Sequence, residues 1–161
     1  MKDDLEERGE DLAFRCAMFF KEKLQTMDSR LVLEEGVRPV DEQIIYEIKI
    51  HVHERMFESG KWSTRTHSAW LWSGYLGVAF DHSLGVVLVN GTGQLNLRLP
   101  PIISSEQFFL NIKQRIITDT DMLSCADAIC QMVAKAMENI GACIFMNEIM
   151  DAAQDGDRDA R

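Results

Sequence analysis

The segment from Tyr46 to His53 alternates between apolar and polar residues without a break. Apolar residues occupy its even positions, and charged residues or histidines occupy its odd positions. A period of two over this length is typical of a β-strand with one buried and one solvated face. The pattern therefore predicts a half-buried strand over residues 43–56, with His51 and His53 side by side on the solvated face.

The flanking segments predict an α+β fold. Residues 3–27 have the spacing of an amphipathic helix. Further strands are expected at 30–35, 68–80, 86–89 and 94–99, with a loop at Gly36 and Pro39 and a hairpin turn at Asn90-Gly91-Thr92-Gly93. The segment 68–80 also fits an apolar helix. Helices are then expected at 104–116 and 118–137, with Gly141 as a candidate C-terminal cap and further helical turns around 144–150.

The expected architecture is an N-terminal helix, a central antiparallel sheet of four to five strands, and C-terminal helices packed on one face. Residues 1–150 are expected to form a single domain, and residues 151–161 a flexible acidic C-terminal tail.

The formal net charge of −9 argues against direct binding of nucleic acid, which depends on Lys and Arg displacing counterions from phosphates. The best local basic cluster is Arg55, Lys61 and Arg65. The acidic charge suits a basic protein partner, including a nucleic-acid-binding protein whose site the chain covers. No apolar stretch approaches the roughly 20 residues of a membrane span, and the acidic N-terminus does not look like a secretory signal. We therefore expect a cytoplasmic protein with no membrane partner.

The cysteines predict neither disulfides nor a zinc site. Cys16, Cys125, Cys130 and Cys143 lie among apolar residues at helical spacing, and no CxxC pair occurs. Free cysteines in such positions are commonly buried as small hydrophobic residues.

His51 and His53 are the candidate metal ligands, since two neutral imidazoles on one strand face can hold a zinc, iron or copper ion. His-x-His followed by Glu58 resembles the first metal-binding motif of the cupin barrels. That resemblance implies one divalent transition metal held by His51, His53 and Glu58. Ile45 and Arg65 stand where the motif has glycine. The alternative interpretation is a solvated strand face that carries two histidines.

Three smaller patterns have structural explanations. Asp81-His82-Ser83 lies in an expected turn, where Asp commonly bonds to its own backbone. Asp119 and Asp121 lie at an expected helix start, with Thr118 as a candidate N-cap. Gly91-Thr92-Gly93 lacks the rest of any phosphate-binding loop.

An aromatic group supplies the candidate partner-binding surface: Trp62, Trp70, Trp72 and Tyr75. Trp and Tyr dominate binding hot spots, and Trp70 and Trp72 share one face of the expected strand. The alternative is that they pack beneath a helix. Five methionines in the expected C-terminal helices suit either a core or a partner groove, and they predict a homodimer: Met122, Met132, Met137, Met146 and Met150.

Two functional interpretations follow. The favoured one is a non-catalytic acidic protein-binding module without a cofactor, of the adaptor, chaperone or inhibitor type, from a mobile element or a secretion system. In charge, size and fold class the chain resembles small secretion chaperones. The alternative is a small metal-dependent enzyme that uses the His51–His53 pair. No complete catalytic motif is present, so the sequence favours binding over catalysis.

Overall fold

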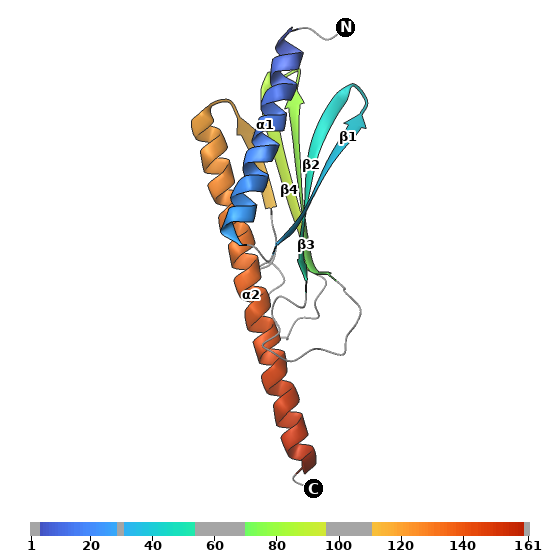
Figure 1. Ribbon diagram of the computed structural model, residues 1–161, viewed down its shortest axis with the longest axis vertical. Coiled ribbons are helices and arrows are strands. Elements are labelled where there is room, and N and C mark those ends of the chain that lie inside the picture. The colour runs from blue at the N-terminus through green and yellow to red at the C-terminus, as the bar shows by residue number, and fades with distance from the viewer. Residues whose placement is uncertain (1–3, 29–30, 54–69, 96–110, 160–161) are drawn as a thin grey trace.

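The computed structural model describes residues 4–28, 31–53, 70–95 and 111–159 (Figure 1). In chain order, its elements are α1 (Asp4–Met27), β1 (Val32–Val40), β2 (Gln43–His53), β3 (Trp70–Asp81), β4 (Val86–Leu95), β5 (Asn111–Ile116) and α2 (Asp119–Asp159).

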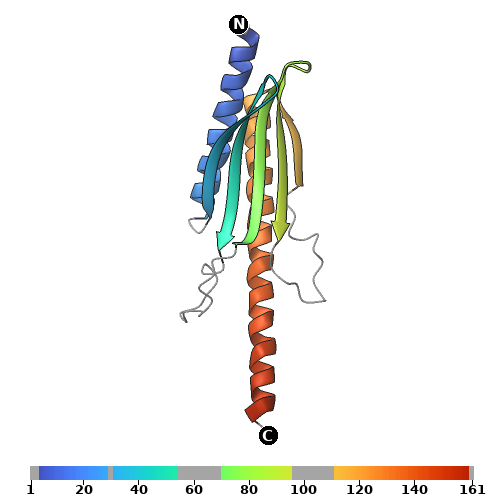
Figure 2. The ribbon, with the colours of Figure 1, turned by 90° about the vertical axis from the view of Figure 1, so that its right-hand side faces the viewer.

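The five strands form one antiparallel sheet in the order β1-β2-β3-β4-β5, so that strands adjacent in the sequence pair with each other. Both helices lie along the same face of this sheet, and among the described residues no helix lies on the other face (Figure 2). α1 packs mainly on β3 and β2, and α2 packs on α1 and β5. The α+β class is therefore confirmed, with the N-terminal and C-terminal helices sharing one covered face.

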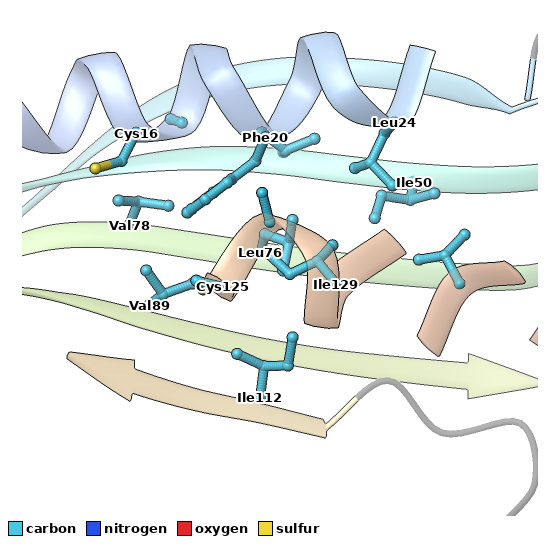
Figure 3. Close-up of a cluster of buried hydrophobic side chains, with 14 of the residues drawn as sticks. Cys16, Phe20, Leu24, Ile50, Leu76, Val78, Val89, Ile112, Cys125 and Ile129 are labelled. Carbon is cyan, nitrogen blue, oxygen red and sulfur yellow. The ribbon is translucent and has the colours of Figure 1, made fainter. Parts of the chain in front are cut away.

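The predicted alternation in β2 is confirmed. Ile48, Ile50 and Val52 are fully buried beneath the helices, and Figure 3 shows side chains of α1, the sheet and α2 meeting in one apolar cluster. From the apolar face expected for α1, Cys16, Phe20 and Leu24 are buried, whereas Leu5 is 63% exposed. Phe14 lies at the margin, 43% exposed, in an edge-to-face contact with Tyr46 of β2. Burial of side chains this large provides most of the free energy that holds such a layer together.

The predicted hairpin at Asn90–Gly93 is wrong, because β4 runs through these residues while paired with β3. The sharp turns lie elsewhere, where φ is positive at Asp41 between β1 and β2 and at Gly85 between β3 and β4. Gly93 of β4 lies opposite Gly74 of β3. A Cβ at Gly74 would come within 2.5 Å of the Trp72 ring. Gly74 is therefore needed for close packing, and the glycines of this region do not mark a turn.

The expected loop at Gly36 and Pro39 is also wrong. Both residues belong to β1, which is an edge strand and continues to Val40. Proline is tolerated there because an edge strand makes ladder bonds on one side only.

The prediction of separate C-terminal helices is wrong in two places. Residues 111–116 form β5. The helix prediction failed there because the four-residue spacing of Ile112 and Ile116 fits one strand face as well as one helix face. Residues 104–110 of that predicted helix lie outside the described residues. Gly141 lies within α2 and does not end it, because a helical glycine costs only about 1 kcal/mol relative to alanine. Residues 151–159 are part of α2.

α2 begins with the predicted cap at Thr118. The Asp121 N–H donates to Thr118 Oγ1 at 3.2 Å, and the Thr118 N–H donates to Asp121 Oδ2 at 3.0 Å. This reciprocal arrangement satisfies backbone donors that have no partner within the helix. The hydrogen bonds from the backbone amides of Ile117 and Thr118 hold the pKa of Asp121 below its usual value.

Candidate functional site on the open face of the sheet

The candidate site lies on the sheet face that neither helix covers. We call the residues of β1, β2 and β3 that carry its polar side chains the open face: Glu34, Arg38, Glu47, Lys49, His51, Ser73 and Tyr75. They share this face because side chains alternate along a strand, and because the register places Lys49 between Glu34 and Tyr75. The open face therefore consists of polar groups from three neighbouring strands.

Arg38 joins two of these strands to its own. Its Nε donates to Glu47 Oε1 at 2.7 Å, and its Nη2 donates to Tyr75 Oη at 3.3 Å. The hydrogen bonds to Tyr75 and Glu47 raise the pKa of Arg38. An arginine held in this way loses little side-chain freedom when a partner binds, because its geometry is already fixed.

Gly77 provides the space for Tyr75. It lies opposite Glu47 on β2, and a Cβ at Gly77 would come within 3.2 Å of Tyr75 Oη. The tyrosine is half-buried, and burial raises the pKa of its phenol above the usual value. The phenol therefore stays protonated at neutral pH and is available for hydrogen bonding.

A second polar group surrounds His51. Its Nδ1 lies 3.5 Å from Ser73 Oγ, and its Nε2 lies 3.9 Å from Glu34 Oε1. The His51 side chain is only 13% exposed, so its neighbours on β1 and β3 enclose it although it lies on the uncovered face. A serine, a histidine and a carboxylate in this order suggest nucleophilic chemistry, but the separations exceed the 2.6–3.2 Å that proton transfer needs.

The metal site expected at His51, His53 and Glu58 is only partly within the described residues. His51 lies on the open face, His53 is the last residue of β2, and Glu58 lies outside the described residues. Within the described part of the chain, no group of three or more His, Cys, Asp or Glu residues is placed to hold a metal ion. Among the described residues, the polar groups nearest to the His51 ring nitrogens are Ser73 and Glu34.

The four aromatic residues do not form one surface. Trp72 is fully buried and faces the helices, whereas Tyr75 faces the opposite side of β3. Their positions differ by an odd number, so alternation along β3 separates them. Trp72 thus packs beneath the helices, the alternative that the sequence left open. Trp70 is the first residue of β3, and Trp62 lies outside the described residues.

The remaining candidates have structural roles. Ser83 Oγ donates to Asp81 Oδ1 at 2.6 Å, which is a bond of the turn that does not involve His82. His82 instead has its Nδ1 3.6 Å from Glu6 Oε1 and its ring 5.5 Å from that of Phe80, so it joins the turn to α1. Asp121 is the capping residue described above, and Asp119 is the first residue of α2.

The described cysteines behave as buried apolar residues. Cys16 and Cys125 are buried, and Cys130 is half-buried; all three are free thiols. Burial raises the pKa of Cys16 to about 11 and that of Cys125 to about 12. These two thiols are protonated at neutral pH and are therefore poor nucleophiles.

Sequence reasoning missed Arg38 and Ser73. Arg38 was assigned to a loop because of Gly36 and Pro39, yet Glu34, Gly36 and Arg38 have the two-residue period of a strand face. Ser73 carried no signal of its own, because it is placed beside His51 only by the register of β3 against β2.

Comparison with known proteins leaves the assignment to the structure itself. No protein-family model, no curated protein and no solved structure matches the chain significantly. None of the described helices combines the length and the apolar character needed to cross a membrane.

Proposed function

We propose that the chain is a non-catalytic, acidic protein-binding module of the adaptor, chaperone or inhibitor type that acts in the cytoplasm. The observation that carries this proposal is the Arg38–Glu47–Tyr75 group on the open face. Tyr and Arg are the residue types most enriched in binding hot spots, together with Trp. Here Arg38 and Tyr75 are preorganised on a broad sheet face that no described helix covers (Figure 2).

The neighbouring residues favour a protein surface as the ligand. Ile45 and Leu88 are half-buried and provide apolar area on the same face, on either side of the buried Ala79. A central apolar area with a polar rim is the usual composition of a protein interface. The net charge of −9 suits a basic partner, including a nucleic-acid-binding protein, and disfavours nucleic acid itself.

The test is affinity purification of the full chain from its native cell, with quantitative comparison of three variants. Tyr75→Ala and Arg38→Ala are expected to lose the same stoichiometric partner. Asn90→Ala is the matched control, because Asn90 is exposed on the same sheet face but belongs to β4. A partner retained equally by all three variants would place its binding surface elsewhere, and the absence of any stoichiometric partner would refute the proposed function.

The alternative function is a small metal-dependent enzyme that uses His51. The proximity of Glu34 and Ser73 to the two ring nitrogens is the observation in its favour. It requires about one metal ion per chain, lost in a His51→Ala/His53→Ala variant and released at acidic pH, because a protonated imidazole cannot bind a metal. Elemental analysis of chain purified without chelator decides between the two functions.

A further inference from the structure

The outer edge of β1 can accept another strand. β1 pairs with β2 on one side, and no described strand pairs with its other side (Figure 2). The ladder of an antiparallel pair uses every second residue, and Pro39 has no N–H to contribute to the β2 ladder. Leu33, Glu35, Val37 and Pro39 therefore direct their backbone groups to the outer edge. The amides of the first three are placed to bond a further strand.

Apolar side chains lie beside this edge. Val37 is 64% exposed, although its register places it on the sheet face that carries the helices. It lies opposite Tyr46 of β2, whose ring is in edge-to-face contact with Phe14 of α1. Val32, on the open face of the same strand, is 38% exposed. Exposed apolar side chains along an unpaired strand edge are typical of a surface that another strand covers.

We propose that this strand is β1 of a second copy, paired antiparallel around a twofold axis that passes through Gly36. Two five-stranded sheets then become one continuous sheet. Gly36 is the central residue of β1 (Val32–Val40), so this pairing uses the strand over its whole length. Because the axis is perpendicular to the sheet, the open faces of both copies lie on the same side.

Charge complementarity favours the second copy as the partner strand. Pairing centred on Gly36 places Glu34 of each copy directly opposite Arg38 of the other, on the open face. The two side chains are 59% and 57% exposed in the single chain. The bonds of Arg38 to Glu47 and Tyr75 use its Nε and Nη2 atoms, so its Nη1 atom can donate to the carboxylate of the second copy.

The same register covers the exposed valines. On the open face, Val32 lies opposite Val40 of the second copy, which brings two apolar side chains together. On the other face, Val37 lies opposite Glu35, whose carboxylate is already ion-paired with Lys21 of its own α1. The two Val37 side chains are then diagonal neighbours across the axis and can contact each other.

The neighbouring registers are less favourable. Centring the pair on Glu35 would place its two copies opposite each other, and like charges in that position are destabilising. Centring the pair on Val37 would place Pro39 opposite Glu35, which moves its missing N–H towards the middle of the ladder. In the proposed register Pro39 lies opposite Leu33, so that the missing N–H falls only at the two ends.

Sedimentation of the full chain tests whether a dimer forms through β1. We expect the wild type to be dimeric at about 0.1 mM chain. Val37→Glu should raise the dissociation constant at least about tenfold, because it places like charges opposite each other twice per dimer. Leu123→Glu is the matched control and should remain dimeric, since Leu123 is 50% exposed and belongs to α2, which packs on α1 and β5. Circular dichroism checks that both variants are folded.

Charge reversal tests the contact between Glu34 and Arg38. Glu34→Arg places two positive charges opposite each other at both ends of the interface, and it should weaken the dimer about tenfold at low salt. Glu138→Arg is the matched control, because it makes the same change of charge at an exposed position of α2. It is expected to dimerise as the wild type does.

Cross-linking in a glutathione redox buffer tests the position of the axis. Gly36→Cys is expected to form a disulfide-linked dimer, because facing Cα atoms at such a position lie about 4.5 Å apart, within reach of a disulfide. A Cβ at Gly36 has room, with only Glu47 Cβ nearby at 3.8 Å. Val32→Cys is the control, since its two copies would lie more than about 20 Å apart along the ladder, and the wild type controls for the native cysteines.

Three results would overturn the proposal. They are a wild type that stays monomeric, a Val37→Glu or Glu34→Arg variant that dimerises as tightly as the wild type, and a Gly36→Cys variant that cross-links no better than Val32→Cys. The dimer uses the edge of the sheet, and the function proposed above uses its open face. A failure of this dimer would therefore leave the proposed function unchanged.

Discussion

Replacing Gly9 by alanine tests how α1 is seated on the sheet. Gly9 lies in the N-terminal part of α1, and a Cβ built there would come within 2.3 Å of Cγ and Cδ1 of Phe80. Apolar carbon atoms pack at 3.5–4.0 Å, so the helix or the ring would have to move by more than about 1 Å. Phe80 is only 5% exposed beneath the helix, which leaves its ring little room to move.

Two effects oppose each other in this variant. Alanine is the better helix former by about 1 kcal/mol, whereas overpacking of a filled core costs about 1–3 kcal/mol. Because the contact is far below van der Waals distance, we expect the steric cost to dominate. Gly9→Ala should lower the free energy of unfolding by about 1–2 kcal/mol, which corresponds to a melting temperature lower by about 2–8 °C for a chain of this size.

Urea denaturation with two further variants isolates the cause. Gly36→Ala is the control, because its Cβ would have only Glu47 Cβ nearby, at an ordinary 3.8 Å, and we expect it to be neutral or slightly stabilising. In a Phe80→Leu background the cost of Gly9→Ala should largely disappear. A Gly9→Ala variant that is more stable than wild type by about 1 kcal/mol, as at a solvent-exposed helical site, would refute the close packing of α1 on β3.

Three other perturbations test separate parts of the structure. Trp72→Ala should lower the free energy of unfolding by about 3–5 kcal/mol because the ring is fully buried, whereas Tyr75→Ala on the open face should lower it by less than about 1.5 kcal/mol. Equal losses for the two variants in chemical denaturation would contradict the assignment of Trp72 and Tyr75 to opposite faces of the sheet. Thr118→Ala should cost about 1 kcal/mol through loss of the N-cap, and the neighbouring Thr120→Ala should not; both are measured by urea denaturation. Burial raises the pKa values of Cys16 and Cys125 to about 11 and about 12. The stability gained by burying the protonated thiols is therefore complete below the thiol pKa of the unfolded chain, and it falls as pH rises from about 9 towards those values. A Cys16→Ala/Cys125→Ala variant should show a smaller decline in melting temperature over that range, and an unchanged decline would argue against burial of the two thiols.

The sequence was most predictive where one period was unambiguous. The two-residue alternation from Glu47 to Val52 identified β2 and its buried face, and the helical spacing of residues 3–27 identified α1. Thr118 was recognised as a cap because its chemistry is local to the helix start. These features depend on residues close in the sequence, which a single chain reveals directly.

Errors arose where one local pattern fits two structures. Asn90 to Gly93 has the composition of a hairpin turn, but these residues lie within β4. Gly93 is paired with Gly74 of β3, where the Trp72 indole leaves no room for a Cβ. Ile112 and Ile116 fit a helix or a strand equally well, and only pairing with β4 decides between them. In each case a tertiary contact overrode a local preference.

The open face could be predicted only in part. Glu47, Lys49 and His51 follow from the alternation of β2, and Tyr75 was identified by residue type. Arg38 and Ser73 join them through strand register, which is set across segments far apart in the chain. The partners of Tyr75 and His51 were therefore beyond the reach of motif analysis.

Affinity purification of the wild-type chain beside its Tyr75→Ala and Asn90→Ala variants most directly tests whether this protein acts through protein contacts on the open face. The account predicts a stoichiometric partner that the wild type and Asn90→Ala retain and that Tyr75→Ala loses, because Tyr75 is held by Arg38 on the open face. The absence of any stoichiometric partner, or its equal retention by all three proteins, would contradict the account.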